Sequence, residues 1–293
     1  MSVVRSSQSY LFDLVRSQSQ RLGKDVNTLK EQAITGRKIN RPSDAPSSMG
    51  KIVRLREEAA NQEVYKDNTT WAQSIIGTAD TILGETTGLL KRVQEVTVGM
   101  SNDTYSAEDR AAAAKEIDAI RNDLIRLANT EIGDRYLFSG SAYDAPAFDT
   151  NGVYQGDADE PEILIGADNW VRAGWDGSSV FQGSVDSFQM LSDLSTALNS
   201  NIPNNVRNVL GSVDDALEQA IAAHQDVGWA FSKTEDALEL AEHLEVDLTQ
   251  SLSAIVDADP AEAYLRLEEA QMAYSAALQV AAGGMSMGLF EHI

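Results

Sequence analysis

The three histidines are the side chains best suited to acid–base or metal chemistry, and they are scattered over the sequence at His224, His243 and His292. Histidine titrates near neutral pH and binds metals through its imidazole nitrogens. His224, however, falls on an apolar stripe beside Ala220 and Val227, where a histidine packed at the edge of a core is the ordinary interpretation. We assign no catalytic role to these residues.

Other catalytic signatures are missing from the sequence. It has no phosphate-binding GxxxxGK[ST] loop, no GxSxG nucleophile turn and no HExxH zinc motif. It has no cysteine, which rules out disulfides, thiolate metal sites and a cysteine nucleophile. The sequence therefore predicts neither an enzyme active site nor a cofactor.

The segment Asp149–Glu160 has the length of a calcium-binding loop and a glutamate at its twelfth position. Such a loop also needs an oxygen ligand at its fifth position and a glycine at its sixth. Val153 and Tyr154 stand at those two positions. A polar turn is the favoured interpretation, and we expect no metal.

The charge is uneven along the chain. The formal net charge is −22, yet residues 1–60 contain eleven Lys or Arg against six Asp or Glu, a balance of +5, whereas residues 201–293 contain three against sixteen, a balance of −13. Either the two ends pair, or the acidic end is a solvated surface. The acidic total argues against nucleic acid as a partner. No apolar run is long enough to span a membrane, and the first twenty residues lack the apolar core of a signal peptide, so we expect a soluble chain exported without one.

Apolar residues recur with a period of seven over two long segments, which is typical of helices that pack along their whole length. The first stripe is Tyr65, Asn68, Ala72, Ile75, Ala79, Ile82, Thr86, Leu89, Val93, Val96 and Met100. The second stripe runs from Val206 to Ile255 through Val213, Leu217, Ala220, Val227, Phe231, Leu238, Leu248 and Leu252. A helix of about 50 residues is roughly 75 Å long. We therefore predict an elongated antiparallel helical rod.

Shorter helices are predicted on either side. The first runs from about Ser7 to Thr35 and ends at Gly36. Another begins at Ser106, which can form a capping box with Asp109. Two more are expected over residues 188–198 and 261–287.

Residues 139–184 break the helical pattern, because seven glycines separate short β-prone runs such as Ile163–Ile165 and Trp170–Val171. We predict a small β-rich insert here, with Trp170 and Trp175 as its core. The expected domains are paired terminal helices (1–45 with 257–293), a helical rod (46–138 with 185–256) and the insert (139–184). The fold class is mainly α, with the insert at the far end of the rod from the termini.

Two motifs resemble those of a known family, the flagellins and hook-associated proteins. Thr35–Pro46, read as TGRKINRPSDAP, is similar to the turn that follows the first helix in that family. LANT at 127–130 followed by GDRYLFSG at 133–140 resembles the hook-associated members rather than the flagellins. Ala261–Leu267 and Gly288–Phe290 are similar to the family's final helix. The resemblance covers roughly residues 5–140 and 186–293.

The resemblance implies a structural subunit of the bacterial flagellum, secreted and placed at the junction between hook and filament, which allows filament growth through helix packing. It implies other hook and junction proteins, flagellin, an export chaperone and the type III export apparatus as partners, and a ring of identical subunits. It places the assembly interface on the terminal helices and on the turn that follows the first of them. The expected interface residues are Leu11, Val15, Leu22, Val26, Leu29, Gly36, Pro42, Asp44, Leu267, Tyr274, Leu278, Leu289 and Phe290. A filament-forming flagellin and an unrelated coiled-coil tether are the alternatives.

Overall fold

A computed structural model of the chain describes residues 2–290 and, of their side chains, Tyr10 and residues 13–282. The chain forms two compact units. Unit 1 is Met1–Ala60 together with Glu245–Ile293, and unit 2 is Asn61–Leu244. Two long helices, α2 (Pro46–Met100) and α6 (Pro203–Val256), contribute to both units.

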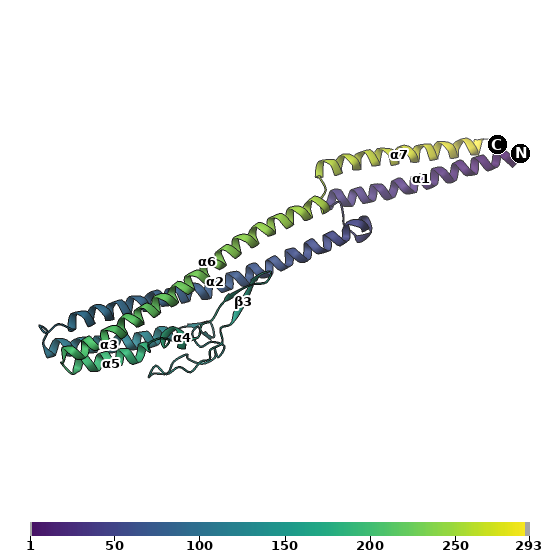
Figure 1. Ribbon diagram of the computed structural model, residues 1–293. Coiled ribbons are helices and arrows are strands. Elements are labelled where there is room, and N and C mark those ends of the chain that lie inside the picture. The colour runs from purple at the N-terminus through teal and green to yellow at the C-terminus, as the bar shows by residue number, and fades with distance from the viewer. Residues whose placement is uncertain (1, 291–293) are drawn as a thin grey trace. The chain divides into compact units, whose positions relative to one another are not determined.

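Unit 1 is built around two helices from opposite ends of the chain. Helix α1 (Ser2–Thr35) and helix α7 (Pro260–Phe290) lie side by side (Figure 1). A short 3-10 helix, η1 (Pro42–Asp44), follows α1 and precedes the start of α2. The predicted pairing of the terminal helices is confirmed, and α1 begins earlier than the expected Ser7.

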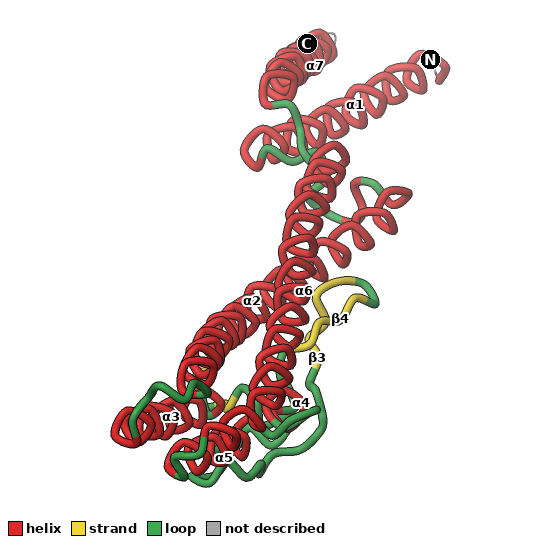
Figure 2. Tube along the Cα trace, turned by 60° about the vertical axis from the view of Figure 1, so that its left-hand side comes forward, coloured by secondary structure: helices red, strands yellow, loops and turns green. Residues whose placement is uncertain are grey.

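Unit 2 is built on antiparallel packing of α2 against α6. Gln94 donates a hydrogen bond to Asp214 (2.6 Å), and the His224 and Asp80 side chains are 3.0 Å apart. Helix α3 (Ala107–Ala128) packs on α5 (Ser187–Asn199), and both lie beside the α2–α6 pair in Figure 2. The predicted mainly helical, antiparallel fold is confirmed.

Both heptad stripes are buried or half-buried along their length, as the sequence predicted. In α2 the members Ala72, Ile75, Ala79, Ile82, Thr86, Val93 and Val96 are buried, and in α6 Val206, Val213, Leu217, Ala220, Val227 and Ala241 are buried. Helix α2 extends 19 residues before the stripe, since it begins at Pro46, a residue favoured in a first helical turn. The Ser106–Asp109 capping box of α3 is present as predicted.

Apart from isolated bridges, the strands in the described part of the chain form two short antiparallel pairs. Strand β1 (Glu131–Ile132) pairs with β2 (Arg135–Tyr136), and β3 (Glu162–Gly166) pairs with β4 (Asn169–Arg172). The last two coincide with the β-prone runs identified in the sequence. Most of the remaining segment 139–184 is loop, apart from helix α4 (Gly177–Phe181).

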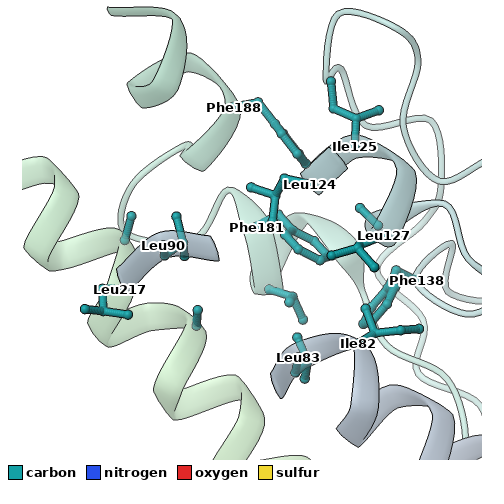
Figure 3. Packing of buried hydrophobic residues seen from close by; sticks show 14 of the residues in the cluster. Ile82, Leu83, Leu90, Leu124, Ile125, Leu127, Phe138, Phe181, Phe188 and Leu217 are labelled. Atoms are coloured by element: carbon teal, nitrogen blue, oxygen red, sulfur yellow. The ribbon is translucent and has the colours of Figure 1, made fainter. Parts of the chain in front are cut away.

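A cluster of four buried phenylalanines ties segment 139–184 to the helices on either side of it. Phe148 and Phe181 come from the segment, Phe138 precedes it and Phe188 lies in α5; Figure 3 shows three of them beside Leu124 and Leu127 of α3. Phe181 lies 5.3 Å from Phe138, 5.6 Å from Phe148 and 5.7 Å from Phe188 between ring centroids. The core thus contains residues from both sides of the expected insert boundaries.

The two tryptophans predicted to form the insert core behave differently. Trp175 is 3% exposed and packs near Phe138, with ring centroids 6.4 Å apart. The prediction for Trp170 is wrong, because its side chain is 48% exposed. In strand β4 the neighbouring Val171 faces the core, and successive side chains of a strand point to opposite faces.

Candidate assembly interface

The α1–α7 pair contains most of the residues expected at the interface. Val15, Leu22, Val26 and Leu29 on α1 are half-buried, and so are Leu267 and Tyr274 on α7. These side chains are therefore largely used in pairing within the chain. Gly23 lies opposite the Tyr274 ring, and a Cβ at this glycine would meet the ring at 3.4 Å, an ordinary contact distance.

The outer surface of α7 has a second set of apolar side chains, which sequence reasoning missed apart from Leu278. These exposed residues are Tyr264, Leu265, Met272, Leu278 and Val280. The sequence did contain a signal, because apolar residues surround α7 on all sides. A helix of this kind is normally buried on all sides. In the described monomer it is covered on only one.

Three expected interface residues cannot be placed. The side chains of Leu11, Leu289 and Phe290 lie outside the described residues, although the backbone is helical at each of the three positions.

The turn after α1 contains the other three expected residues. Gly36 has a φ of +68°, which glycine adopts without strain, and its N–H bonds to the Gln32 carbonyl (2.9 Å) to end α1. Pro42 begins η1 and is exposed. Asp44 is exposed and accepts hydrogen bonds from the N–H groups of Asn40 (3.0 Å) and Arg41 (2.7 Å).

These backbone donors explain the acidity of Asp44. The N–H of Arg41 and then that of Asn40 lower the pKa of its carboxyl below 3.8, because both bonds favour the ionised form. The carboxylate therefore holds the turn in one conformation at neutral pH.

The turn after α1 is bonded to the turn between α6 and α7. Lys38 donates from its N–H to the Val256 carbonyl (2.6 Å), and Ala258 donates to the Gly36 carbonyl (2.9 Å). Arg37 and Asp257 form an antiparallel bridge between these bonds. Backbone hydrogen bonds thus join the two ends of the chain beside the α1–α7 pair.

The charge asymmetry does not produce ion pairs between α1 and α7 in the described part of the chain. The described ion pairs of unit 1 lie within one end, as in Arg41–Glu31 (3.2 Å) and the Arg266–Glu262 pair. The observed α1–α7 contacts are therefore mainly apolar.

The groups considered for chemistry have structural partners. His224 is half-buried beside Asp80, and the Asp149 carboxylate accepts bonds from the N–H groups of Asn151 and Val153 within its own turn. No group of three or more metal-binding side chains occurs among the described residues. In the same part of the chain no helix is long and apolar enough to cross a membrane.

Comparison with known proteins agrees with this architecture. The model of the bacterial flagellin N-terminal helical region matches residues 14–143. Flagellar hook-associated protein 3 of Escherichia coli K12 is 26% identical over 255 residues, which cover 78% of this chain and 80% of that protein. The chain is therefore similar to structural proteins of the bacterial flagellum, to the flagellins over its N-terminal half and to hook-associated protein 3 over most of its length.

Two further comparisons differ in how much of the chain they cover. Flagellin A of Vibrio anguillarum is 31% identical over 122 residues, but these cover only 41% of the chain and 32% of the flagellin. The crystal structure of the flagellar junction protein FlgL from Legionella pneumophila has a TM-score of 0.60 at 17% identity, covering 71% of the chain and 99% of that structure. At this identity the likeness shows a shared fold.

The structure gives physical reasons for the GDRYLFSG motif. Gly133 has a φ of +61° in the tight β1–β2 turn, and Gly140 has a φ of +69° where a Cβ would overlap neighbouring oxygen atoms. Between them, Leu137 and Phe138 enter the core. The motif therefore packs the end of the first helical part of unit 2 into the core and directs the chain into segment 139–184.

Proposed function

We propose that this chain is the subunit that joins the flagellar hook to the filament outside the cell. The observation that supports this best is the extent of similarity. Likeness to hook-associated protein 3 continues over 78% of the chain, whereas likeness to flagellin A stops at 41%. Its partners are hook and filament components, a ring of its own copies, and the export chaperone and apparatus that deliver it.

The outer surface of the α1–α7 pair is the proposed docking surface. The half-buried stripe residues hold α1 against α7, and the exposed side chains of α7 remain free to contact neighbouring subunits. Covering an apolar side chain contributes roughly 1.5 to 3 kcal/mol. Five such side chains can therefore supply a large part of the free energy of docking.

Labelling intact flagella with a tagged full-length chain tests the placement. A single band of label between hook and filament is expected. Label along the whole filament would instead support the flagellin alternative. Growth on filament seeds separates the two again, since a flagellin extends seeds indefinitely and a junction subunit does not.

Substitutions on α7 test the docking surface. Leu265→Ser with Met272→Ser should strongly reduce label at the junction while the purified chain keeps its helix content, because both side chains are exposed in the monomer. Ala273→Ser, at an exposed alanine of the same helix, is the control. Undiminished label for the double variant would refute this surface.

A further inference from the structure

An exposed arginine of unit 2 is held between two aromatic rings and has no acidic partner. The Arg135 guanidinium carbon lies 4.3 Å from the centre of the Tyr143 ring and 5.6 Å from that of Trp71. Trp71 is 46% exposed, and Arg135 and Tyr143 are exposed as well. Stacking fixes the guanidinium and leaves its N–H donors at the rim of the rings.

The other arginines of unit 2, all of which the structure describes, have oxygen partners. Arg92, Arg126, Arg172 and Arg207 bind carboxylates, and Arg110 and Arg121 donate to carbonyl groups. Among the described residues, none forms a hydrogen bond or ion pair with the Arg135 guanidinium. Tryptophan, tyrosine and arginine are also the residues most enriched where binding energy concentrates at protein interfaces. Trp71, Arg135 and Tyr143, here called the arginine patch, therefore have the composition of a contact site.

A second exposed patch lies on α6 and contains a carboxylate. The Lys233 ammonium also lies over its Trp229 ring, 5.6 Å from the ring centre, and donates to the Trp170 carbonyl. Trp229 is 66% exposed and Leu240 is 59% exposed, with the exposed Asp236 between them. At 100° per residue these three positions fall within about 40° of one another on the helix. Asp236 has no ion-pair partner in unit 2 as described. This set is called the aspartate patch.

The aspartate patch faces away from α2, at the level of Trp71 of the arginine patch. Val227 and Phe231 belong to the stripe of α6 that faces α2, and Trp229 is two residues from each of them. Around the helix axis Trp229 therefore lies about 160° to 200° from that stripe. Gly77 lies opposite Phe231, and Gln94 binds Asp214, so the antiparallel register places Trp71 opposite residue 237. Trp71 of the arginine patch and Asp236 of the aspartate patch thus share a level along the helix pair.

We infer that the arginine patch of one copy binds the aspartate patch of the next copy. The inference rests on the proposed function, because it names the contact between neighbouring copies. An arginine flanked by apolar rings matches a carboxylate flanked by apolar side chains in both charge and polarity. Two different patches on one chain make a head-to-tail contact, and such contacts give a closed ring where the rotation between successive copies completes a full turn.

The charge of unit 2 explains why this contact has to be specific. Residues 61–244 contain eleven basic and thirty-one acidic side chains, a balance of −20. Neighbouring copies of such a unit repel one another unless a local cation faces a carboxylate. Arg135 supplies that cation in a position where the rest of the chain has not neutralised it.

Charge exchange in the full-length chain tests the inference on flagella of a strain that lacks its own copy. Arg135→Glu and Asp236→Arg should each reduce junction label roughly tenfold or more. The double variant should restore it, because each new glutamate meets a new arginine on the next copy. Lys115→Glu, at an exposed lysine of α3 without aromatic neighbours, is the matched control. Unimpaired single variants, or a double variant as weak as the singles, would overturn the contact.

Cross-linking identifies the occupant directly, since the chain has no cysteine of its own. Asp134→Cys combined with Ser232→Cys should give a ladder of linked copies with a short bismaleimide, and Asp134→Cys combined with Lys115→Cys should not. Linkage to a different flagellar protein, or no ladder in correctly labelled junctions, would refute the copy-to-copy contact and leave the proposed function standing. A ladder formed by copies away from the junction would support the copy-to-copy contact and refute the proposed function.

Discussion

Replacing Phe181 by alanine should destabilise the whole of unit 2. Phe181 is buried and meets the rings of Phe138, Phe148 and Phe188 at centroid distances of 5.3 to 5.7 Å. A buried Phe→Ala change costs about 3 to 5 kcal/mol, and each ring pair adds about 0.5 to 1.5 kcal/mol beyond its burial. We expect a loss near the upper end, about 5 kcal/mol. Domains are typically stable by only about 5 to 15 kcal/mol.

Urea unfolding and calorimetry of the full-length chain measure this loss. The matched control is Trp170→Ala, which removes a larger ring from the same segment but an exposed one, so its cost should stay below about 1 kcal/mol. Equal losses for the two variants would refute the placement of these side chains.

The same experiment tests the predicted insert at 139–184, whose boundaries remain a prediction. If residues 139–184 belong to the core of unit 2, Phe181→Ala shifts a single transition that includes the helices. A separate low-temperature transition, with α-helical signal unchanged, would mean that the insert is an independent domain.

Three further changes probe local features of unit 2. Gly140→Ala should lower the free energy of unfolding by at least about 2 kcal/mol more than Gly133→Ala does, which is roughly the cost of one severe steric overlap. Both glycines have a positive φ, but only Gly133 has open space around it. Similar thermal midpoints for the two variants would contradict this. Ser106→Ala should cost about 1 kcal/mol at pH 7 in urea titrations. The Ser106 hydroxyl and then its N–H lower the pKa of Asp109, so the part of this cost that comes from the hydroxyl–carboxylate bond is present above pH 3.8 and is lost as the pH falls through the lower folded pKa. The bond from the Asp109 N–H to the hydroxyl does not titrate, so a cost that grows on acidification would be the wrong outcome. Arg110→Leu should cost about 3 kcal/mol in the same assay, since this buried guanidinium serves three oxygen acceptors; a cost under about 1 kcal/mol would show that they are satisfied without it.

The long helices could be predicted because their signal is local and repeated. Alternating steps of three and four residues identify the stripe that faces a partner helix whatever that partner is. The capping pair Ser106–Asp109 and the stop at Gly36 were readable for the same reason, since each depends on a few neighbouring residues. The pairing of α1 with α7 was suggested by the opposite charges of the two ends and implied by the family resemblance, although the described contacts between them include no ion pair.

Contacts between distant residues could not be predicted in this way. Nothing in the sequence around Arg110 predicts that it is buried. It is buried because the turns at Asn102 and Asn201 meet at its side chain. Trp170 was assigned to a core on size alone, whereas the register of β3 with β4 turns it outward. Likewise, nothing local shows that Arg135 lies between two rings, because Trp71 is 64 residues away from it.

The bridge between Arg37 and Asp257 sets an order of events during folding. Closing this loop of 220 residues from the unfolded chain costs about 5 kcal/mol in entropy. Once residues 61–244 have folded, only the short flanking stretches remain to be ordered, and the cost falls by about 1.5 kcal/mol. The middle of the chain should therefore fold first and bring its two ends within reach of each other. A subunit that completes its ends last can keep them available until its neighbours are in place.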